Sequence, residues 1–494
     1  MSNHIKTKRR KWPYILWGVF VFFVLLIVGT YYLIQHIGIE GLLSSRFLQN
    51  QITKHVGETE GDIFELLPTA LGFQEPKTYL VLFLNNTELR PGGGFIGVYA
   101  TIELDRGKIN VLKVEGTELL DNHSSKVGLI DPPEPISKYL KVDGWYFRDS
   151  NWSPDFSESS KRSLELYKRE DGVAATDIDA VVGVTSQVLE ELMKRTGPLT
   201  VDGITFTPEN VIAELEHEVE YNFQDRGIAT RDRKDIVESL MHAILDKIKD
   251  DVLRHPAEYR SLAEKLLQQK HIVAYALDPV IQDTLHTHYA DGAVQQTSGD
   301  YLMWVDANLG ALKTDHAIDR TVTYFIRSAV DESGKKYYQA TVNTQYVHTH
   351  PFDWRTSRYL TYARVYVPAG SEFISANIMT PPHMIDPKNI QSGSELGKQW
   401  FGTFVSVEPL TTQSVVFTYR LPDSITKQID EGLYTLMVQK QIGLVGARLT
   451  LDLDFGTTIQ SATPAEPSSE WGNSTYRTQS VFDSDQKFDV TLGK

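Results

Sequence analysis

An uninterrupted apolar run near the start of the chain, from Tyr14 to Ile34, constrains this protein most, because it contains no charged residue. About 20 apolar residues suffice for a helix to cross the hydrocarbon core of a bilayer. Five basic residues lie among the first eleven positions, and the first charge after the run is Glu40. The positive-inside rule then places the N-terminus in the cytoplasm. We expect a cytoplasmic basic tail over 1–11 and a transmembrane helix over 12–35.

Everything after this helix is expected outside the cytoplasm of a single-pass cell-membrane protein. The alternative is a cleaved signal peptide, whose apolar core is shorter, about 7–15 residues, and is followed by small residues at a cleavage site. The run has neither feature. Residues 36–75 are expected to form a stalk or an N-terminal layer.

Composition excludes several classes of function. The chain has 49 basic and 64 acidic residues and a net charge of −15, which argues against nucleic acid as a partner. It has no cysteine, so disulfides and cysteine-ligated metals are excluded. Secreted eukaryotic domains usually carry disulfides, so we expect a bacterial envelope protein.

Residues 76–317 alternate between short apolar runs and helical patterns. Tyr79 to Asn85 is almost wholly apolar, as in a buried strand. Ile178 to Val184 is a second such run, and the amphipathic pattern after it stops at Gly197-Pro198. Strands alternating with helices predict a three-layer α/β domain with a mixed central sheet.

After residue 318 the helical periods vanish, and period-two runs separated by turn residues take their place. Leu449 to Phe455, for example, alternates strictly. This pattern predicts an all-β, immunoglobulin-like sandwich over 318–460. The Ser-, Thr- and Pro-rich residues 461–494 are expected to form a C-terminal tail.

A glycine-rich segment between two apolar runs is the first candidate site. Adjacent glycines expose backbone N–H groups to an anion, and an arginine beside them offers a bidentate fork for phosphate. A tight turn with a surface arginine is the alternative. The candidate ligand-binding residues here are Asn85, Asn86, Glu88, Arg90 and Gly93.

A second candidate segment runs from Trp145 to Phe156. Arg148 could hold a phosphoryl oxygen, Asp149 or Asp155 a hard cation, and Trp152 could line an apolar groove. The alternative is a structural ion pair beneath a packed loop.

A third segment carries Arg231, Asp232 and Arg233 at the expected start of a helix, where an anion gains from the free N–H groups. Asp232 could instead be only an N-cap. The acidic residues between Glu209 and Glu220 are expected to form a solvated helix face.

The order of these pieces resembles a family of bacterial membrane-anchored proteins known as domain of unknown function 4012. The resemblance is carried by three segments, which are residues 85–95, residues 148–156 and Asp306-Ala307-Asn308-Leu309-Gly310. The family name implies no activity.

The α/β part is also distantly similar to the LytR–CpsA–Psr phosphotransferases, which move glycopolymers from polyprenyl pyrophosphate carriers onto peptidoglycan. This similarity implies that Arg90, Arg148 and Arg233 neutralise phosphates while Asp149 holds Mg²⁺. It implies Arg148, Asp149 and Asp155 as catalytic residues. That family usually has an aspartate as a magnesium ligand two residues after its first arginine, whereas this chain has Gly92.

Two functions therefore remain open. The chain could bind a polyprenyl-pyrophosphate-linked glycopolymer and transfer it to the cell wall as a phosphotransferase. Alternatively, it is a non-catalytic envelope binding or scaffolding protein, whose α/β domain binds a polymer or lipid and whose β-sandwich binds a protein partner. Three arginines and an acid that converge beside an apolar tunnel would favour transfer.

Overall fold

The computed structural model describes residues 68–228, 235–379 and 382–493. The expected transmembrane helix over 12–35 and the basic tail before it lie outside these residues, as does most of the expected stalk. Among the residues that the structure describes, no helix is long and apolar enough to cross a membrane.

The first part of the chain forms a five-stranded mixed sheet. Its strands have the order β3-β2-β1-β4-β7, in which β1 pairs with β4 in parallel and the other neighbours are antiparallel. The centre of β1 is buried on both faces, as its apolar run predicts. The bounds are β1 Lys77–Asn85, β2 Phe95–Asp105, β3 Lys108–Gly116, β4 Ile178–Thr185 and β7 Ile272–Ala276.

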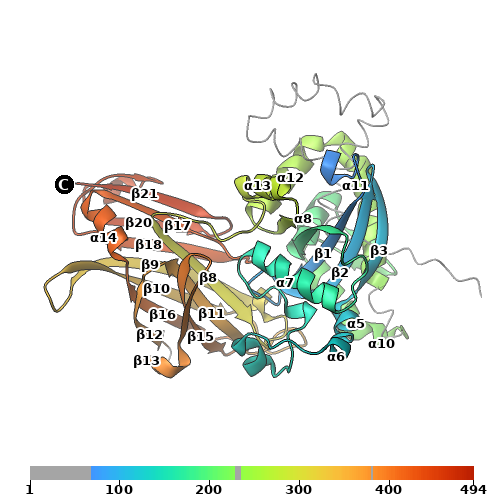
Figure 1. Cartoon of the computed structure of the whole chain (residues 1–494), viewed down its shortest axis with the longest axis horizontal. Coiled ribbons are helices and arrows are strands. Elements are labelled where there is room, and N and C mark those ends of the chain that lie inside the picture. Colours follow the sequence, from blue (N-terminus) through green and yellow to red (C-terminus); the bar gives the residue numbers. More distant parts are fainter. Residues whose placement is uncertain (1–67, 229–234, 380–381, 494) are drawn as a thin grey trace, which may run out of the picture.

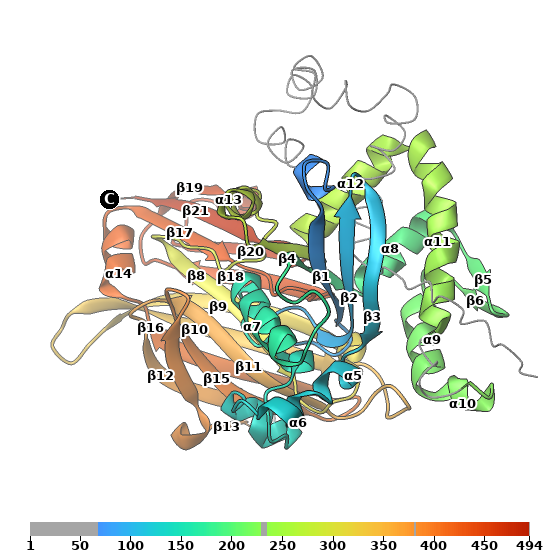
Figure 2. The ribbon, with the colours of Figure 1, turned by 45° about the vertical axis from the view of Figure 1, so that its right-hand side comes forward.

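Helices cover both faces of this sheet, in agreement with the expected α/β class (Figures 1 and 2). One face packs on α8, α11 and α12 through a core that includes Val81, Leu189 and Leu240. The other packs on α7 through Leu82, Phe156 and Tyr167. The helices are α5 Thr117–Asp121, α7 Phe156–Arg169, α8 Gln187–Thr196, α9 Val211–His217, α11 Asp235–Arg254, α12 Pro256–Gln268 and α13 Pro279–Thr287.

The second part is a sandwich of two seven-stranded sheets with one shared core. The first sheet has the order β13-β12-β16-β10-β9-β18-β20, and the second β14-β15-β11-β8-β17-β21-β19. Alternate residues of β18 are buried, as its alternating sequence predicts. The bounds are β8 Asp300–Asn308, β9 Ile318–Val330, β10 Lys336–His348, β11 Tyr359–Pro368, β12 Glu372–Met379, β13 Pro382–Met384, β14 Gln391–Glu395, β15 Lys398–Val407, β16 Thr412–Arg420, β17 Leu433–Val438, β18 Ala447–Asp454, β19 Ile459–Thr463, β20 Thr475–Val481 and β21 Gln486–Leu492.

The sandwich differs from the expected one at both ends. β8 lies before the expected boundary at 317, yet it is an inner strand between β11 and β17 and is buried at every position. The expected tail over 461–494 contains β20 and β21, because alternate residues of β21 enter the core despite the polar composition. The result is larger than an immunoglobulin domain of seven to nine strands.

Candidate functional site

The glycine-rich segment lies against the second part of the chain instead of facing a ligand. Asn86 Nδ2 donates to the Gly443 carbonyl at 2.9 Å. A Cβ on Gly443 would lie 2.0 Å from the Gly93 carbonyl oxygen, so the two backbones touch. Gln441 Nε2 donates to the Arg90 carbonyl at 3.0 Å. The glycines therefore allow the close approach of residues 439–443.

Arg90 is buried in an ion cluster at this contact. Its Nε donates to Asp149 Oδ1 at 3.0 Å, its Nη2 to Glu88 Oε1 at 3.2 Å, and its Nη1 to the Asn308 carbonyl at 2.6 Å. Burial opposes the charged form of Arg90, but the carboxylates of Asp149 and Glu88 raise its pKa overall. Arg90 thus joins all three segments that carry the family resemblance. We call the contact of residues 86–93 with Asn308 and residues 439–443 the seam.

Two other candidates are structural. Asp155 is the N-cap of α7: its Oδ1 accepts from the Glu158 N–H at 3.1 Å, and its Oδ2 accepts from the Val294 N–H at 2.9 Å. The ring of Trp152 lies 4.7 Å from the Arg364 guanidinium of β11, and its carbonyl accepts from that group at 2.9 Å. Both side chains fasten the α/β part to the sandwich or to the loop before it.

The surroundings of Asp149 do not fit the Mg²⁺ that the resemblance implies. Its Oδ1 accepts from Arg90, its Oδ2 lies 3.7 Å from Arg148 Nε, and its side chain is buried. In the part of the chain that the structure describes, no three His, Asp or Glu side chains are grouped to hold a metal. We derive no step through a metal.

Arg148 points into a different environment from Arg90. Its side chain is 29% exposed, and its Nη1 lies 3.1 Å from Asp121 Oδ2 on α5. Its guanidinium lies 4.5 Å from the centre of the Tyr146 ring. Behind it, burial raises the pKa of Asp121 and of Glu170, and the neighbouring carboxyl of the pair raises the pKa of Glu170 further.

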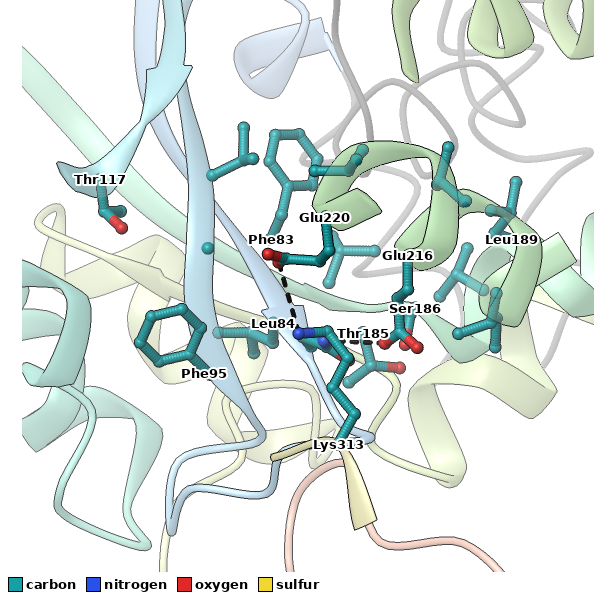
Figure 3. Close-up of a pocket in the computed structure, with 18 of the residues that line it drawn as sticks. Phe83, Leu84, Phe95, Thr117, Thr185, Ser186, Leu189, Glu216, Glu220 and Lys313 are labelled. Atoms are coloured by element: carbon teal, nitrogen blue, oxygen red, sulfur yellow. Dashed lines mark hydrogen bonds and ion pairs between the residues drawn. The ribbon is translucent and has the colours of Figure 1, made fainter. Parts of the chain in front are cut away.

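Arg148 borders an apolar groove of about 500 Å³ between the sheet and the helices. Figure 3 shows this groove, with Phe83, Leu189 and Lys313 among the labelled residues that line it. This volume lies in the range of about 300–1,000 Å³ that is usual for ligand sites. Strands β1 and β2 form its floor with Phe83, Gly97 and Val98. Its wall comes from α8, α9 and the π-helical turn η3 (Glu218–Asn222), through Val188, Leu189, Leu192, Ile212, Leu215 and Val219.

The local sequence explains this wall. Val188, Leu189 and Leu192 share one face of α8, which ends at Gly197 with a φ of +76°. Ile212, Leu215 and Val219 recur at three- and four-residue spacing, so one apolar stripe continues from α9 into η3.

Charged groups gather at the mouth of the groove. Lys313, from the connection after β8, lies 3.4 Å from Glu220 Oε1, as Figure 3 shows. Burial disfavours the charged form of Lys313, but the carboxylates of Glu220, Glu216 and Glu88 raise its pKa overall. Glu216 accepts from Asn85 Nδ2 at 3.0 Å and from Arg355 Nε at 2.6 Å. Thus Glu216 is paired, not part of a solvated face.

Of the residues singled out in the sequence, only Asn85 and Arg148 border the groove. Seven other candidates lie in the seam or next to it: Asn86, Glu88, Arg90, Gly93, Asp149, Trp152 and Asp155. Arg231 and Arg233 lie outside the described residues. Sequence reasoning missed Lys313, and it placed Glu216 and Glu220 on a solvated helix face instead of at the groove. The apolar stripe of α9 was visible in the sequence, but the lysine that meets it comes from a distant segment.

Residues 74–220 match a family described as a protein of unknown function (DUF4012). None of the curated proteins matches the chain. Among solved structures, the protein lpg2210 of Legionella pneumophila is 8% identical over 39% of this chain and 71% of its own, with a TM-score of 0.26.

Two further solved structures resemble parts of the chain. The Lin1025 protein of Listeria innocua is 11% identical over 53% of this chain and 90% of its own, with a TM-score of 0.23. B. subtilis TagV, a LytR–CpsA–Psr enzyme, is 12% identical over 44% of this chain and 80% of its own, with a TM-score of 0.23. Such low scores and identities say nothing about what this chain binds.

Proposed function

We propose that this chain is a membrane-anchored, extracytoplasmic protein of the bacterial cell envelope that binds the apolar chain of an amphiphile in the groove. The observation that carries the proposal is the groove itself, which is walled mainly by apolar side chains and has few charged ones, Glu118, Arg148, Glu216, Glu220 and Lys313. Burial of apolar surface contributes about 25 cal/mol per Å². The groove therefore suits a hydrocarbon chain whose polar end stays near Arg148 and Lys313.

A polyprenyl-linked glycopolymer fits this description, because it joins a long apolar chain to a phosphate and a hydrophilic polymer. Arg148 offers a fork for a phosphate oxygen, and Lys313 a second cation. Glu216 and Glu220 lie at the same mouth, so the head group displaces existing ion pairs instead of entering a purely basic site.

Binding without catalysis is favoured over transfer to peptidoglycan. Transfer would need Asp149 or Asp155 as a base and Arg90 beside the phosphates. All three side chains are buried and bonded within the protein. The position of Arg148 alone favours the phosphotransferase, and an assay of polymer transfer distinguishes the two functions.

Gly97 offers a direct test, because it lies on the floor of the groove and only Phe95 comes within 4 Å of where its Cβ would be, at 3.8 Å. In Gly97→Leu, the Cβ has room and the rest of the side chain takes up volume of the groove. We expect the affinity of the detergent-purified full chain for undecaprenyl phosphate to fall by roughly tenfold or more, since overpacking costs about 1–3 kcal/mol.

Gly97→Ala is the matched control, because it adds one methyl group at the same position and should bind nearly as wild type does. Unchanged thermal unfolding of both variants excludes misfolding. Equal affinity of Gly97→Leu and wild type would show that the amphiphile, if bound, lies elsewhere.

A further inference from the structure

Four exposed apolar side chains surround the mouth of the groove. They are Tyr221, Leu312, Phe352 and Trp354, with exposures of 48%, 49%, 62% and 36%. Tyr221 lies in η3, Leu312 precedes Lys313, and the other two lie on the loop between β10 and β11. We call these four residues the mouth surface.

Contacts between the three segments that carry these residues connect the mouth surface with the groove. The Trp354 ring lies 5.5 Å from the Tyr221 ring and 4.7 Å from the His217 ring. Tyr221 Oη donates to the Trp354 carbonyl at 3.2 Å. Leu312 forms a bridge with Thr356 of the same loop. Arg355, which lies between Trp354 and Thr356 in this loop, pairs with Glu216 at the groove.

The backbone at Leu312 is unusual for such a place. Its φ is +50°, in the left-handed region, where glycine or asparagine is less strained than leucine. Leu312 therefore combines a strained backbone with an apolar side chain that remains exposed to water.

We propose that the mouth surface docks on the phospholipid bilayer, so that the amphiphile passes between the bilayer and the groove. The proposal rests on the proposed function, because only a lipid ligand must leave a bilayer. Tyrosine and tryptophan favour the membrane–water interface, and phenylalanine and leucine enter its apolar side. The loop of residues 349–358 also carries Arg355 and Arg358, which pair with Glu216 and Glu408, so the apolar and aromatic side chains make the contact with the bilayer.

The absence of cysteine from the chain allows a clean test. In Phe352→Cys the introduced thiol is the sole one, and it takes an environment-sensitive fluorophore. The labelled full chain is mixed with vesicles of phosphatidylglycerol and phosphatidylcholine that carry nitroxide-labelled lipid. We expect loss of fluorescence, because the label enters the bilayer surface.

Val330→Cys is the matched control. Val330 is 65% exposed at the end of β9, in the hairpin that points away from the α/β part (Figure 1). The label there should keep its fluorescence, although the chain itself is bound to the vesicle. Equal quenching at both positions, or none at 352, would overturn the proposal and leave a protein partner for the mouth surface.

Separate results test binding in the groove and docking of the mouth surface on the bilayer. Gly97→Leu in the Phe352→Cys chain should keep the quenching while the groove is blocked. Quenching without any amphiphile in the wild-type groove would reject the proposed function and retain the docking surface. An amphiphile bound in the groove without quenching at position 352 would retain the proposed function and reject the docking surface.

Discussion

At the residue scale, side chains that the sequence predicts as a phosphate site, such as Arg90, form a buried structural cluster in the fold. Glu88 and Arg90 belong to one candidate segment of the sequence and Asp149 to another, and the fold brings the three side chains together. Their burial could not be predicted, because it depends on the Asn308 carbonyl and on Gln441, which arrive from distant segments. Only Arg148, at the edge of the cluster, keeps access to the groove.

The buried cluster predicts a large loss of stability for Arg90→Met. The substitution removes the buried cation that Asp149 and Glu88 share and leaves Asp149 only the longer contact of 3.7 Å with Arg148. Loss of one partner of a buried pair costs about 3–5 kcal/mol. Urea unfolding of the purified chain, followed by tryptophan fluorescence, measures this cost.

The control for this experiment is Arg358→Met, which breaks the exposed pair of Arg358 with Glu408 and should change stability little. A stable Arg90→Met variant that has lost ligand binding would return Arg90 to the phosphate site that the sequence predicted.

Asp121 and Glu170 predict a dependence of stability on pH. Burial first, and then the neighbouring carboxyl, raises the pKa of Glu170 in the folded protein. The folded state therefore keeps a proton that the unfolded chain releases above a pH of about 4.3. Because the folded state binds more protons, the free energy of unfolding falls as the pH rises through the interval between the two pKa values.

Glu170→Gln should remove this contribution and flatten the profile. Urea midpoints of the two proteins at several pH values between about 5 and 8 measure the difference. Parallel profiles for wild type and Glu170→Gln would show that the pair does not hold the extra proton.

At the element scale, the sequence predicted the strands and helices of both parts well, because period-two and helical patterns are local. It missed the membership of β8 and β21. A strand that is buried at every position, such as β8, can belong to either sheet, and the polar composition of residues 461–494 conceals their alternation. The choice depends on pairing partners far away in the sequence.

Residues 439–443, just after β17, are the element that joins the two parts. Ile442 packs in the core beneath α7, and Gly443 touches the Gly93 carbonyl. In Gly443→Ala the Cβ would meet backbone at 2.0 Å, so the seam must open. We expect a markedly lower melting temperature.

Gly446→Ala separates close contact from backbone strain. Gly446 has a φ of +69°, close to the +76° of Gly443, but nothing lies within 4 Å of its Cβ position. Both variants strain the left-handed backbone, and only Gly443→Ala also places a Cβ against the Gly93 carbonyl. Equal melting temperatures would show that the two parts do not touch closely there.

At the scale of the whole molecule, the seam explains why a site can be shared between parts that the sequence shows as separate. The α/β part supplies the groove, while the sandwich side supplies Lys313 and Arg355 at its mouth. Because buried contacts such as Arg90–Asn308 hold the parts together, the mouth has a defined geometry. Sequence patterns predicted each part and the candidate arginine Arg148, but not this shared mouth.

Native mass spectrometry of the full chain, extracted from bacterial membranes in mild detergent, tests the central claim most directly. The account predicts an added mass that corresponds to an amphiphile with a long apolar chain, present on wild type and on Gly97→Ala and absent from Gly97→Leu. A wild-type chain without added mass, under conditions that retain lipids on other membrane proteins, would contradict the claim that the groove binds an amphiphile.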